Sequence, residues 1–553
     1  MSGDIEARRI TGPHLLGDRT GAALDVPLGD DAEERIAAWE QEAARLLAAV
    51  RWGRETTAVG RFAGGAHLFV SAPIDSLYAA TELAELAWRR GTGSAAGVEE
   101  VERLRDQVER ARKPALVALE REATRRGLTF LHDDDGVSIG SGRGAQRWPG
   151  DALPSAVSVD WSRLSDVPIA LVTGSNGKTS TVRLAAAMAR EAGHTPGYTT
   201  TDGVSVGKEL VLPTDFAGPM GARVALRDTR ITLAILETAR GGILRRGLAV
   251  RRADAAVITN IAEDHFGDFG VGSLEELLDA KLVVTRVVPD GGSVILNADD
   301  ALLRARGDAM ERVTWFSRGG RVPMAKRQVI LEGDEIVRYD ADRAVIASLG
   351  DVRSATAAAA PHEIENVLAA AAVALALGVP AEAIAPALRR FDPLTDNPGR
   401  GTMLELDGIR IVVDYGHNPH GFAALGRLLE SVPAQRRLLL LGQAGDREDA
   451  AIAQLAASAL ELRPDQIVLK ELASFRRGRA PGEVPALLRA ALLSHGFAAD
   501  AIDQADTELE AVEQALAWAR PGDLLVLLIH DERERVLERL RQSGATAAAG
   551  AKS

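Results

Sequence analysis

A glycine-rich segment with one lysine and two hydroxyl side chains after it has the composition of a phosphate-binding loop. It lies between a short apolar run, residues 169–172, and a helical pattern, residues 182–193. The segment consists of Gly174, Ser175, Asn176, Gly177, Lys178, Thr179 and Ser180. A turn between a strand and a helix directs backbone N–H groups at an anion, and the helix N-terminus and the Lys178 ammonium add positive charge. The Thr179 hydroxyl is then a candidate ligand of Mg²⁺.

The segment departs from the general nucleotide-binding loop G-x-x-x-x-G-K-S/T, because Val172 stands where the first glycine would be. The alternative interpretation is a Gly/Ser turn before a helix, with Lys178 exposed to solvent. The order of strand, loop and helix favours phosphate binding over this alternative.

The elements that would position the loop are short apolar runs that alternate with helical patterns from residue 168 onward. The predicted strands are 169–172, 231–236, 255–259, 293–296, 409–413, 437–441, 466–469 and 524–529. Near-continuous Val, Ile and Leu strands separated by helices are typical of parallel sheets covered on both faces. A segment with Pro and Gly at 391–401 divides this region, so we predict two α/β domains, 166–395 and 396–542.

The first 165 residues have a different pattern. The spacing of apolar residues predicts helices near 31–50 and 77–90, with a short strand at 67–70 between them. Residues 98–126 mix acidic and basic side chains at i,i+3 and i,i+4 steps, which favours a solvated helix over a nucleic-acid surface. We therefore predict an α+β domain over 1–165. The chain should end in a disordered tail, 543–553, rich in Ala, Gly, Ser and Thr.

The composition limits the classes of function. The 553-residue chain is 46% hydrophobic and 26% charged, which supports buried cores. Its net charge of −13 has the wrong sign for binding duplex DNA through the overall field, so we expect no nucleic-acid partner. The chain has no cysteine, which excludes disulfides and thiolate chemistry and leaves oxygen and imidazole as metal ligands. With no signal-peptide pattern and no apolar run near the ~20 residues that span a bilayer, we expect a soluble cytoplasmic protein without a membrane partner.

The sequence TGSNGKTS, residues 173–180, resembles the T-G-T/S-N-G-K-T-T/S loop of the Mur ligase family, whose members are ATP-dependent ligases that join amino acids to carboxylates. The resemblance extends from residue 168 to about 540. It implies a Mur ligase-like P-loop central domain and a Rossmann-like α/β C-terminal domain, preceded by the smaller α+β domain.

The resemblance also implies roles for residues downstream of the loop. Glu237, in LETARGGIL, would bind a first Mg²⁺ with Thr179, and His265, in TNIAEDHFGDFG, would bind a second. Lys281 matches a lysine that many members carry in carbamylated form as a further metal ligand. Lys178, Glu237, His265 and Lys281 would thus form the catalytic set. The other residues that match nucleotide-binding positions are Asn260, Asn297 in the adenine-recognising NADD segment, and Arg400, Asp414 and His417 of the closing C-terminal domain.

Several phrases resemble the cyanophycin synthetase branch of this family, among them ETARGGILRRGL, VVDYGHNPHGF and HDERERVLERL. The opening RRITGPHLLGDR resembles the N-terminal domain of that branch. That branch carries an ATP-grasp domain between its N-terminal domain and its Mur-like half, and this sequence has no room for one. We therefore expect one half-reaction, in which an amino acid, with arginine as the leading guess, is joined to an Asp- or Glu-type carboxylate of a small-molecule or peptide acceptor.

In the scheme that the resemblance implies, Lys178 and the loop hold the phosphates of ATP, and two Mg²⁺ ions assist formation of an acyl phosphate that the amine attacks. Three arginines, Arg476, Arg477 and Arg479, are candidates for holding an acidic acceptor, and a solvated basic turn is the alternative. Two other functions stay open. One is glutamate addition to a folate-like or wall-precursor substrate, and the other is a non-catalytic subunit for a separate ATP-grasp ligase partner. A homo-oligomer is also left open.

Overall fold

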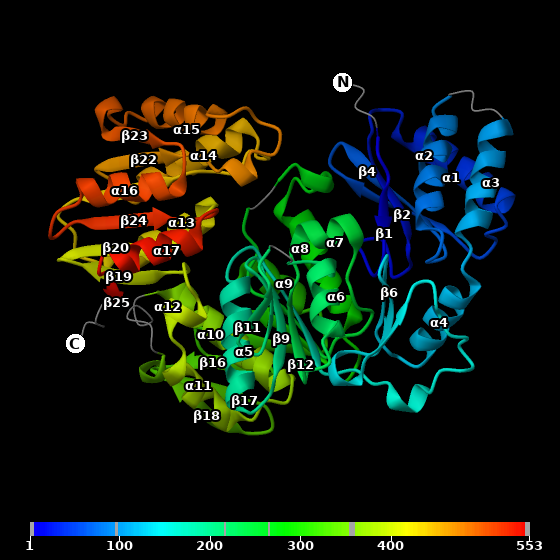
Figure 1. The fold of residues 1–553 in the computed structure, drawn as a ribbon, viewed down its shortest axis with the longest axis horizontal. Helices are drawn as coiled ribbons and strands as arrows, with labels where there is room; N and C mark the ends of the chain where they lie inside the picture. Colours follow the sequence, from blue (N-terminus) through cyan, green and yellow to red (C-terminus); the bar gives the residue numbers. More distant parts are fainter. Residues whose placement is uncertain (1–4, 94–97, 215–216, 264–265, 353–359, 548–553) are drawn as a thin grey trace.

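The computed structural model describes residues 5–93, 98–214, 217–263, 266–352 and 360–547. Within these ranges the chain forms an N-terminal region, a central domain built on a large mixed sheet, and a C-terminal domain built on a second sheet. The N-terminal region and the C-terminal domain lie on either side of the central domain (Figure 1).

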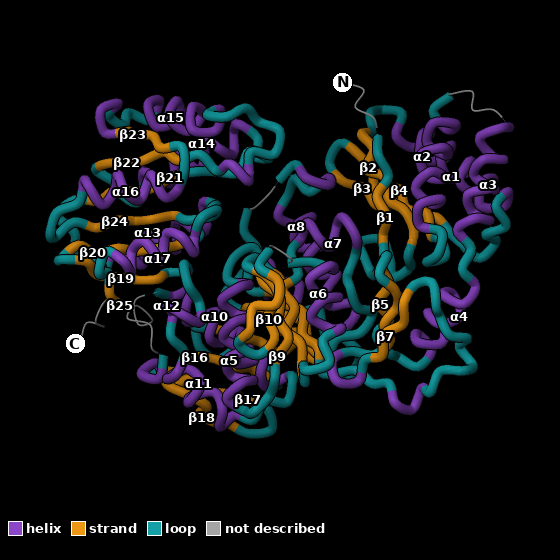
Figure 2. Tube along the Cα trace, in the orientation of Figure 1, coloured by secondary structure: helices purple, strands orange, loops and turns teal. Residues whose placement is uncertain are grey.

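Two helix-covered sheets make up the described N-terminal region (Figure 2). The first, of strand order β1-β2-β4-β3, comprises β1 (Arg8–Ile10), β2 (Gly21–Pro27), α1 (Ala32–Ala49), β3 (Thr57–Phe62), β4 (Gly65–Ser71), α2 (Leu77–Gly91) and α3 (Val98–Ala111). The second comprises α4 (Pro114–Arg125), β5 (Phe130–Asp133), β6 (Gly136–Ile139) and β7 (Gln146–Pro149). The helical pattern predicted over 98–126 is divided between α3 and α4, because Pro114 lacks an N–H group and begins a new helix.

The central domain has the strand order β11-β10-β9-β12-β8-β13-β14-β15-β16-β17-β18. Its strands are β8 (Ile169–Thr173), β9 (Pro196–Thr200), β10 (Gly203–Val206), β11 (Glu209–Leu212), β12 (Leu233–Glu237), β13 (Ala255–Ile258), β14 (Ser293–Asn297), β15 (Val313–Ser317), β16 (Arg327–Glu332), β17 (Glu335–Tyr339) and β18 (Arg343–Ser348). Its helices are α5 (Lys178–Glu191), α6 (Pro219–Arg227), α7 (Arg240–Arg246), α8 (Leu274–Leu282), α9 (Ala301–Gly307), α10 (Pro361–Ala376) and α11 (Ile384–Arg390). The strands from β9 to β16 in this order are parallel, which confirms the predicted α/β class.

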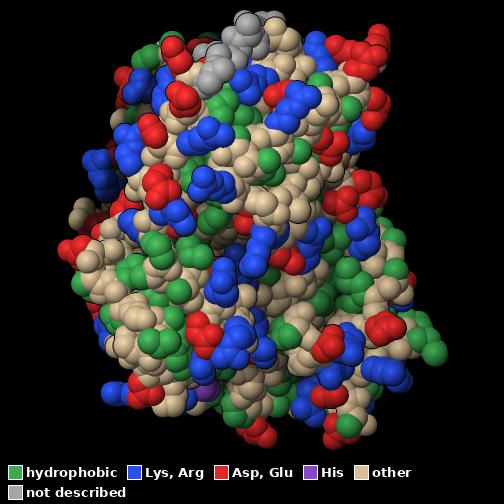
Figure 3. Space-filling view, turned by 90° about the vertical axis from the view of Figure 1, so that its right-hand side faces the viewer, with side chains coloured by type: hydrophobic (Ala, Val, Ile, Leu, Met, Phe, Trp, Pro, Cys, Tyr) green, Lys and Arg blue, Asp and Glu red, His purple; other side chains and the backbone are tan. Residues whose placement is uncertain are grey.

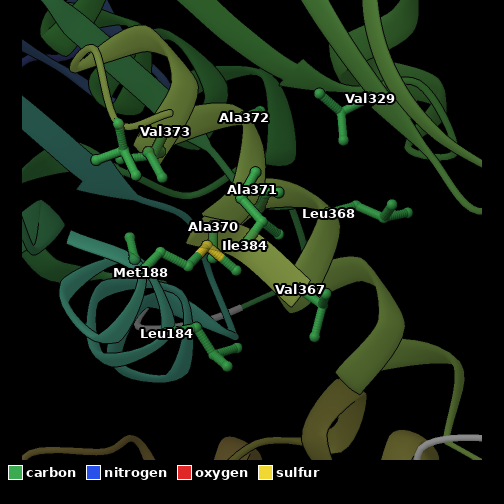
Figure 4. Packing of buried hydrophobic residues seen from close by; sticks show 14 of the residues in the cluster. Leu184, Met188, Val329, Val367, Leu368, Ala370, Ala371, Ala372, Val373 and Ile384 are labelled. Atoms are coloured by element: carbon green, nitrogen blue, oxygen red, sulfur yellow. The ribbon is translucent and has the colours of Figure 1, made fainter. Parts of the chain in front are cut away.

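Helices cover both faces of the central sheet. On one face α5, α10 and α11 pack together, and Met188 of α5, Ala370 of α10 and Ile384 of α11 belong to one buried cluster there (Figure 4). Helices α6 to α9 cover the other face. Along β8, Val172 belongs to the first core and its neighbour Leu171 to the second, as the period of two in a strand requires. One side of α5 is buried against this core along the length of the helix. This packing holds the N-terminus of α5 in place beside the end of β8.

The C-terminal domain has the strand order β23-β22-β21-β24-β20-β19-β25. Its strands are β19 (Thr402–Leu406), β20 (Ile409–Asp414), β21 (Arg437–Leu441), β22 (Gln466–Lys470), β23 (Ile502–Ala505), β24 (Leu524–Leu528) and β25 (Thr546–Ala547). Its helices are α12 (Pro393–Asp396), α13 (Pro419–Glu430), α14 (Asp449–Leu460), α15 (Glu483–Ser494), α16 (Glu508–Trp518) and α17 (Arg533–Gln542). The strands from β23 to β20 are parallel, and apolar cores lie on both faces of the sheet.

The end of the chain differs from the prediction of a disordered tail over 543–553. Ala545 is buried, and Thr546 and Ala547 form β25, which pairs with Glu405 and Leu404 of β19. Pairing with β25 satisfies backbone N–H and C=O groups of β19 that would otherwise be unpaired at the edge of the sheet, and this pairing orders residues 546 and 547. Residues 548–553 lie outside the described residues.

The outer face of the N-terminal region carries interspersed acidic and basic side chains (Figure 3). Pairs such as Arg112 with Glu109 (3.1 Å) and Arg125 with Glu122 (2.6 Å) lie at the predicted i,i+3 steps on solvent-exposed helices. Within the described residues, every helix is too short or too polar to cross a membrane.

Candidate active site

The carboxyl ends of the two parallel sheets face one another across a cavity of about 880 Å³. In open parallel sheets, ligands bind outside the carboxyl ends of the strands, where the loops to the following helices begin. Here the lining residues follow β8, β12 and β13 of the central domain and β20, β21 and β24 of the C-terminal domain. A ligand in the cavity would therefore contact both domains.

The predicted phosphate loop connects β8 to the N-terminus of α5, and it is held tightly. Gly177 has a φ of +84°, and a Cβ there would lie 2.2 Å from Asn366 Oδ1, so only glycine fits. The Asn176 carbonyl accepts hydrogen bonds from the Thr259 hydroxyl (2.6 Å) and the Asn260 amide (3.2 Å). The Asn176 N–H donates to Asn260 Oδ1 at 2.9 Å. Asn260, predicted to bind nucleotide, thus lines the cavity while both ends of its amide support the loop.

Lys178 places its ammonium group directly over the loop. Its Nζ donates to the carbonyl oxygens of Gly174 and Ser175, each at 3.0 Å. It forms no ion pair with any carboxylate in the described part of the chain, so its charge can attract a phosphate. The Ser180 hydroxyl points elsewhere and accepts a hydrogen bond from Asn397 Nδ2 at 3.1 Å, which links the loop to the segment before the C-terminal domain.

Thr179 and Glu237 bring two oxygen ligands together beside the loop. The Thr179 hydroxyl donates to Glu237 Oε2 at 2.8 Å, and Glu237, the last residue of β12, is 1% exposed. Mg²⁺ prefers hard oxygen ligands and takes few of them from protein, so this pair fits the ion that the sequence predicts there.

Lys281 and His265 were predicted as ligands of a second ion. Lys281, in the last turn of α8, is 2% exposed and lines the same cavity as the loop. His265 lies outside the described residues. In the part of the chain that the structure describes, no three His, Asp or Glu side chains gather as a metal site.

Asn297, predicted to belong to an adenine-recognising segment, is buried at the end of β14. Its Nδ2 donates to the Thr259 carbonyl at 3.0 Å, its Oδ1 accepts from the Asp299 N–H at 2.9 Å, and it is 2% exposed. Both ends of the amide are therefore bound to backbone. The residue ties β14 to the end of β13 and is absent from the described lining of the cavity.

Arg400, Asp414 and His417 line the same cavity as the loop. The Asp414 carboxylate accepts hydrogen bonds from the N–H groups of Gly401 and Gly416, both at 2.7 Å. The Arg400 guanidinium lies 4.0 Å from the centre of the Tyr415 ring. These contacts fix the segment that follows β20, which includes His417, as one wall of the cavity.

Hydrogen bonds join the loop directly to the C-terminal domain, among them one from Asn418 Nδ2 to Asn176 Oδ1 at 3.2 Å. Asn176 Nδ2 contacts His420 Nδ1 at 2.9 Å and Asn418 Oδ1 at 3.4 Å. The two domains therefore meet at the loop that is predicted to bind the phosphates.

A second junction, which sequence analysis did not predict, surrounds Asp202. Its carboxylate pairs with Arg183 of α5 at 2.5 Å and also with Arg533 of α17. Burial alone would raise the pKa of Asp202, but Arg400, Arg183 and Arg533 together hold it below its usual range. The carboxylate thus stays ionised and links the central domain to the C-terminal domain.

A buried network under the wall of the cavity was also missed. Lys470 and Glu508 are fully buried and paired, and Lys470 Nζ lies 3.2 Å from His530 Nδ1. Glu508 also accepts hydrogen bonds of 2.7 to 2.8 Å from the backbone N–H groups of 530–532. His530 lines the cavity, and its Nε2 lies 3.2 Å from the Gly416 carbonyl. The network therefore connects the centre of the C-terminal domain to the segment that carries His417.

The charges of this network follow from its contacts. Burial alone would raise the pKa of Glu508, but the Lys470 ammonium and the hydrogen bonds from residue 530 lower it well below the usual range. Burial and the Lys470 charge lower the pKa of His530. His530 is thus neutral, with Nδ1 accepting from Lys470 and Nε2–H donating to Gly416.

Of the three arginines proposed for an acidic acceptor, one lines the cavity. Arg477 does so and pairs with Asp446. Arg479 pairs with Asp449 (2.8 Å) and Glu483 (2.9 Å), and it is absent from the described lining, as is Arg476. The alternative of a solvated basic turn therefore describes much of this segment.

Two family models match the α/β part of the chain. The Mur ligase middle domain matches residues 172–374, and the Mur ligase, glutamate ligase domain matches residues 399–528. The matches together cover more than half of the chain and include the loop, Glu237 and the segment after β20. The chain therefore belongs to the Mur ligase family, as the loop sequence predicted.

Particular relatives extend this assignment. Cyanophycin synthetase from Crocosphaera subtropica is 36% identical over 380 residues, which cover 66% of this chain and 42% of that protein. UDP-N-acetylmuramoylalanine–D-glutamate ligase from Pelotomaculum thermopropionicum is 29% identical over 363 residues, covering 65% of this chain and 69% of that protein. Among solved structures, E. coli FolC in complex with DHPP and ADP has a TM-score of 0.49 at 18% identity, covering 68% of this chain and 88% of that one. The chain spans about 42% of the length of the cyanophycin synthetases that it matches.

Proposed function

We propose that this protein is an ATP-dependent ligase that joins the amine of an amino acid to a carboxylate of an acceptor. The observation that carries the proposal is the grouping of Lys178, the Thr179–Glu237 pair and Lys281 in one cavity between two α/β domains. This grouping supplies positive charge for phosphates and oxygen ligands for Mg²⁺ at the place where a second domain can close over them. Membership in the Mur ligase family supports the same activity.

The chemistry requires activation of the acceptor, since a free carboxylate does not acylate an amine at neutral pH. In the proposed reaction, a carboxylate oxygen attacks the γ-phosphorus of ATP, and the bond to the β–γ bridging oxygen breaks to release ADP. The amine nitrogen then attacks the carbonyl carbon of the acyl phosphate, inorganic phosphate leaves with the bonding electrons, and the amine loses a proton to solvent. Lys178 and the loop N–H groups hold the phosphates in place and stabilise their developing negative charge.

Thr179 and Glu237 would hold a Mg²⁺ ion, and Lys281, once carbamylated, would offer anionic oxygens to a second. Bound Mg²⁺ neutralises charge between the carboxylate and phosphoryl oxygens. Carbamylation would convert the Lys281 ammonium from a cation into an anionic oxygen ligand. Such a ligand suits a side chain that is 2% exposed and lines the cavity.

For the substrates, we propose an amino acid, arginine first, and an Asp- or Glu-type acceptor. The support is the similarity to cyanophycin synthetases over the α/β part of the chain. Because the chain spans about 42% of their length, we assign it one ligation step and not the whole activity of such a protein.

The test is phosphate release from ATP and Mg²⁺ by the purified chain, with each amino acid crossed against a panel of acceptors. The panel includes aspartate, glutamate, oligo-aspartate and β-aspartyl-arginine peptides. Release that depends on both one amino acid and one acceptor is expected. Lys178→Ala should abolish it, whereas the matched control Lys208→Ala, at an exposed lysine in the turn before β11, should retain it. No release by the purified chain, with product formed at the unmodified rate by Lys178→Ala when a separate ATP-grasp ligase is present, would overturn the catalytic proposal and favour a non-catalytic subunit.

A further inference from the structure

Arginines from three elements gather where the N-terminal region meets the central domain. Arg9 belongs to β1, Arg223 to α6, and Arg245 and Arg246 to the last turn of α7. Arg246 Nη1 donates to the Arg9 carbonyl at 3.2 Å, and the Arg9 guanidinium lies 3.9 Å from the centre of the Tyr78 ring. We call these four residues the arginine cluster.

The arginine cluster lacks carboxylate partners in the described ranges. None of its four guanidinium groups forms an ion pair with a carboxylate there, and two nearby carboxylates pair with other arginines. Asp25 pairs with Arg8 at 2.6 Å, and Asp133 pairs with Arg227 at 2.5 Å. Among the described residues, neither of these carboxylates forms an ion pair with a member of the arginine cluster.

The arginines act on one another electrostatically. Burial lowers the pKa of Arg223. The charges of Arg227, Arg246 and Arg9 lower this pKa further, whereas the charge of Asp133 raises it. Burial, Arg9 and Arg245 lower the pKa of Arg246 in the same way. Half-buried like charges that repel one another stabilise the fold poorly, so the arrangement is better suited to binding an anion.

The arginine cluster is continuous with the proposed active site. Arg245 lines the 880 Å³ cavity together with Arg240 of the same helix, Phe269 and Lys281. The Arg245 guanidinium lies 5.9 Å from the centre of the Phe269 ring, and Arg8 of β1 lies 5.2 Å from it on the side of the N-terminal region. An extended molecule with one end near Lys281 could therefore reach the arginine cluster with its other end.

Resting on the proposed function, we infer that the arginine cluster binds a second anionic group of the acceptor, so that the acceptor carries at least two. Guanidinium groups pair with carboxylates and phosphates through two parallel hydrogen bonds, and the class of acceptor is thus an acidic peptide or a similarly polyanionic molecule. The Tyr78 ring, 65% exposed beside Arg9, would contact the apolar part of such a chain. A simple monocarboxylate would bind in the cavity without using the cluster.

The test measures acceptor binding without catalysis, using the full chain and no ATP. Fluorescein-labelled oligo-aspartate is titrated at low ionic strength and followed by anisotropy, with tripolyphosphate as a competitor. Arg223→Gln/Arg246→Gln should weaken binding at least about tenfold, because each charge-assisted contact contributes roughly 1.5–3 kcal/mol. The control Arg230→Gln/Arg312→Gln removes the same charge from two exposed arginines paired with Asp228 and Asp290, and it should change binding less than about twofold.

Two further variants keep the result independent of folding. Arg245→Gln changes an exposed side chain and should also weaken oligo-aspartate binding, whereas Arg223→Lys/Arg246→Lys keeps the charge and should restore much of it. Binding that is unchanged in both Gln variants, or lost equally in the control, would overturn the inference. Failure of unlabelled oligo-aspartate to displace the labelled peptide would show binding through the fluorophore and would also overturn the inference.

Failure of this inference can be told apart from failure of the proposed function. If the cluster variants lose oligo-aspartate binding but the wild type releases no phosphate with any substrate pair, the anion site stands and the ligase proposal fails. If the wild type ligates an acceptor with an unchanged KM in the cluster variants, the ligase proposal stands and this inference fails.

Discussion

Replacing Lys470 with Met tests whether the buried network under the cavity is a coupled unit. Lys470 and Glu508 both have side chains with 0% exposure, so removing the ammonium leaves an ionised carboxylate without its counter-charge. Breaking a buried pair in this way costs about 3–5 kcal/mol. Three backbone hydrogen bonds to Glu508 remain, so we expect the lower end of this range, about 3 kcal/mol.

The double variant Lys470→Met/Glu508→Gln removes both charges and should cost less than the sum of the two single changes, with a coupling of at least about 2 kcal/mol. The matched control is Arg304 with Asp308, an i,i+4 pair whose side chains are 31% and 55% exposed, for which the coupling should stay below about 1 kcal/mol. The assay is equilibrium urea unfolding, with hydrogen exchange of peptides covering β24 to report on the C-terminal domain. A cost below about 1 kcal/mol for Lys470→Met, or additive single changes, would refute the reasoning.

Three other changes have outcomes that follow from the contacts. Glu237→Gln should keep ATP affinity within a few-fold, measured by calorimetry, and lower turnover roughly 10²–10³-fold because a charged oxygen ligand is lost; full turnover would contradict its role. Lys281→Met should be inactive, and removing bicarbonate should slow the wild type if the lysine is carbamylated; activity indifferent to bicarbonate would count against the carbamate. Burial, with Arg286 and Arg8 nearby, lowers the pKa of His14 from 6.5 to about 4, so the unfolded chain binds a proton first as pH falls. Stability should therefore drop by about 3 kcal/mol between pH 6.5 and 4, and His14→Leu should remove this drop in urea titrations; the same drop in the variant would show that other groups cause it.

Continuous apolar runs explain why the parallel strands could be predicted from sequence. Each predicted strand of the α/β region overlaps an observed one, for example 169–172 with β8 and 524–529 with β24. The parallel strands β9, β15, β16 and β23 were not predicted. The outermost strands of the central sheet, β11 and β18, were also missed, because several of their side chains face solvent, as Glu209 and Leu210 of β11 do. Without a buried face on both sides, such a strand has no near-continuous apolar sequence.

The residues of the site could be predicted only where one local motif carries them. The loop at 174–180 is contiguous, and the resemblance placed Glu237, Lys281 and Asp414 around the same cavity. The role of Asn297 in adenine recognition stays a prediction, and in the structure its amide holds two strands together.

The Lys470–Glu508–His530 network joins three elements far apart in sequence. A lysine at the end of a strand gives no sign that it is buried, because only packing of the complete domain removes it from solvent. The arginine cluster is hidden for the same reason, as β1, α6 and α7 meet only in the folded chain.

The most direct test of the proposed reaction follows the oxygen atoms of the acceptor. If a carboxylate oxygen attacks the γ-phosphorus of ATP, an acceptor labelled with ¹⁸O in its reacting carboxylate must transfer one labelled oxygen to inorganic phosphate in each turnover. Mass spectrometry of the released phosphate should therefore show one ¹⁸O per molecule, in an amount equal to the amide formed. Unlabelled phosphate, or release of pyrophosphate and AMP, would contradict the acyl-phosphate ligase that we propose.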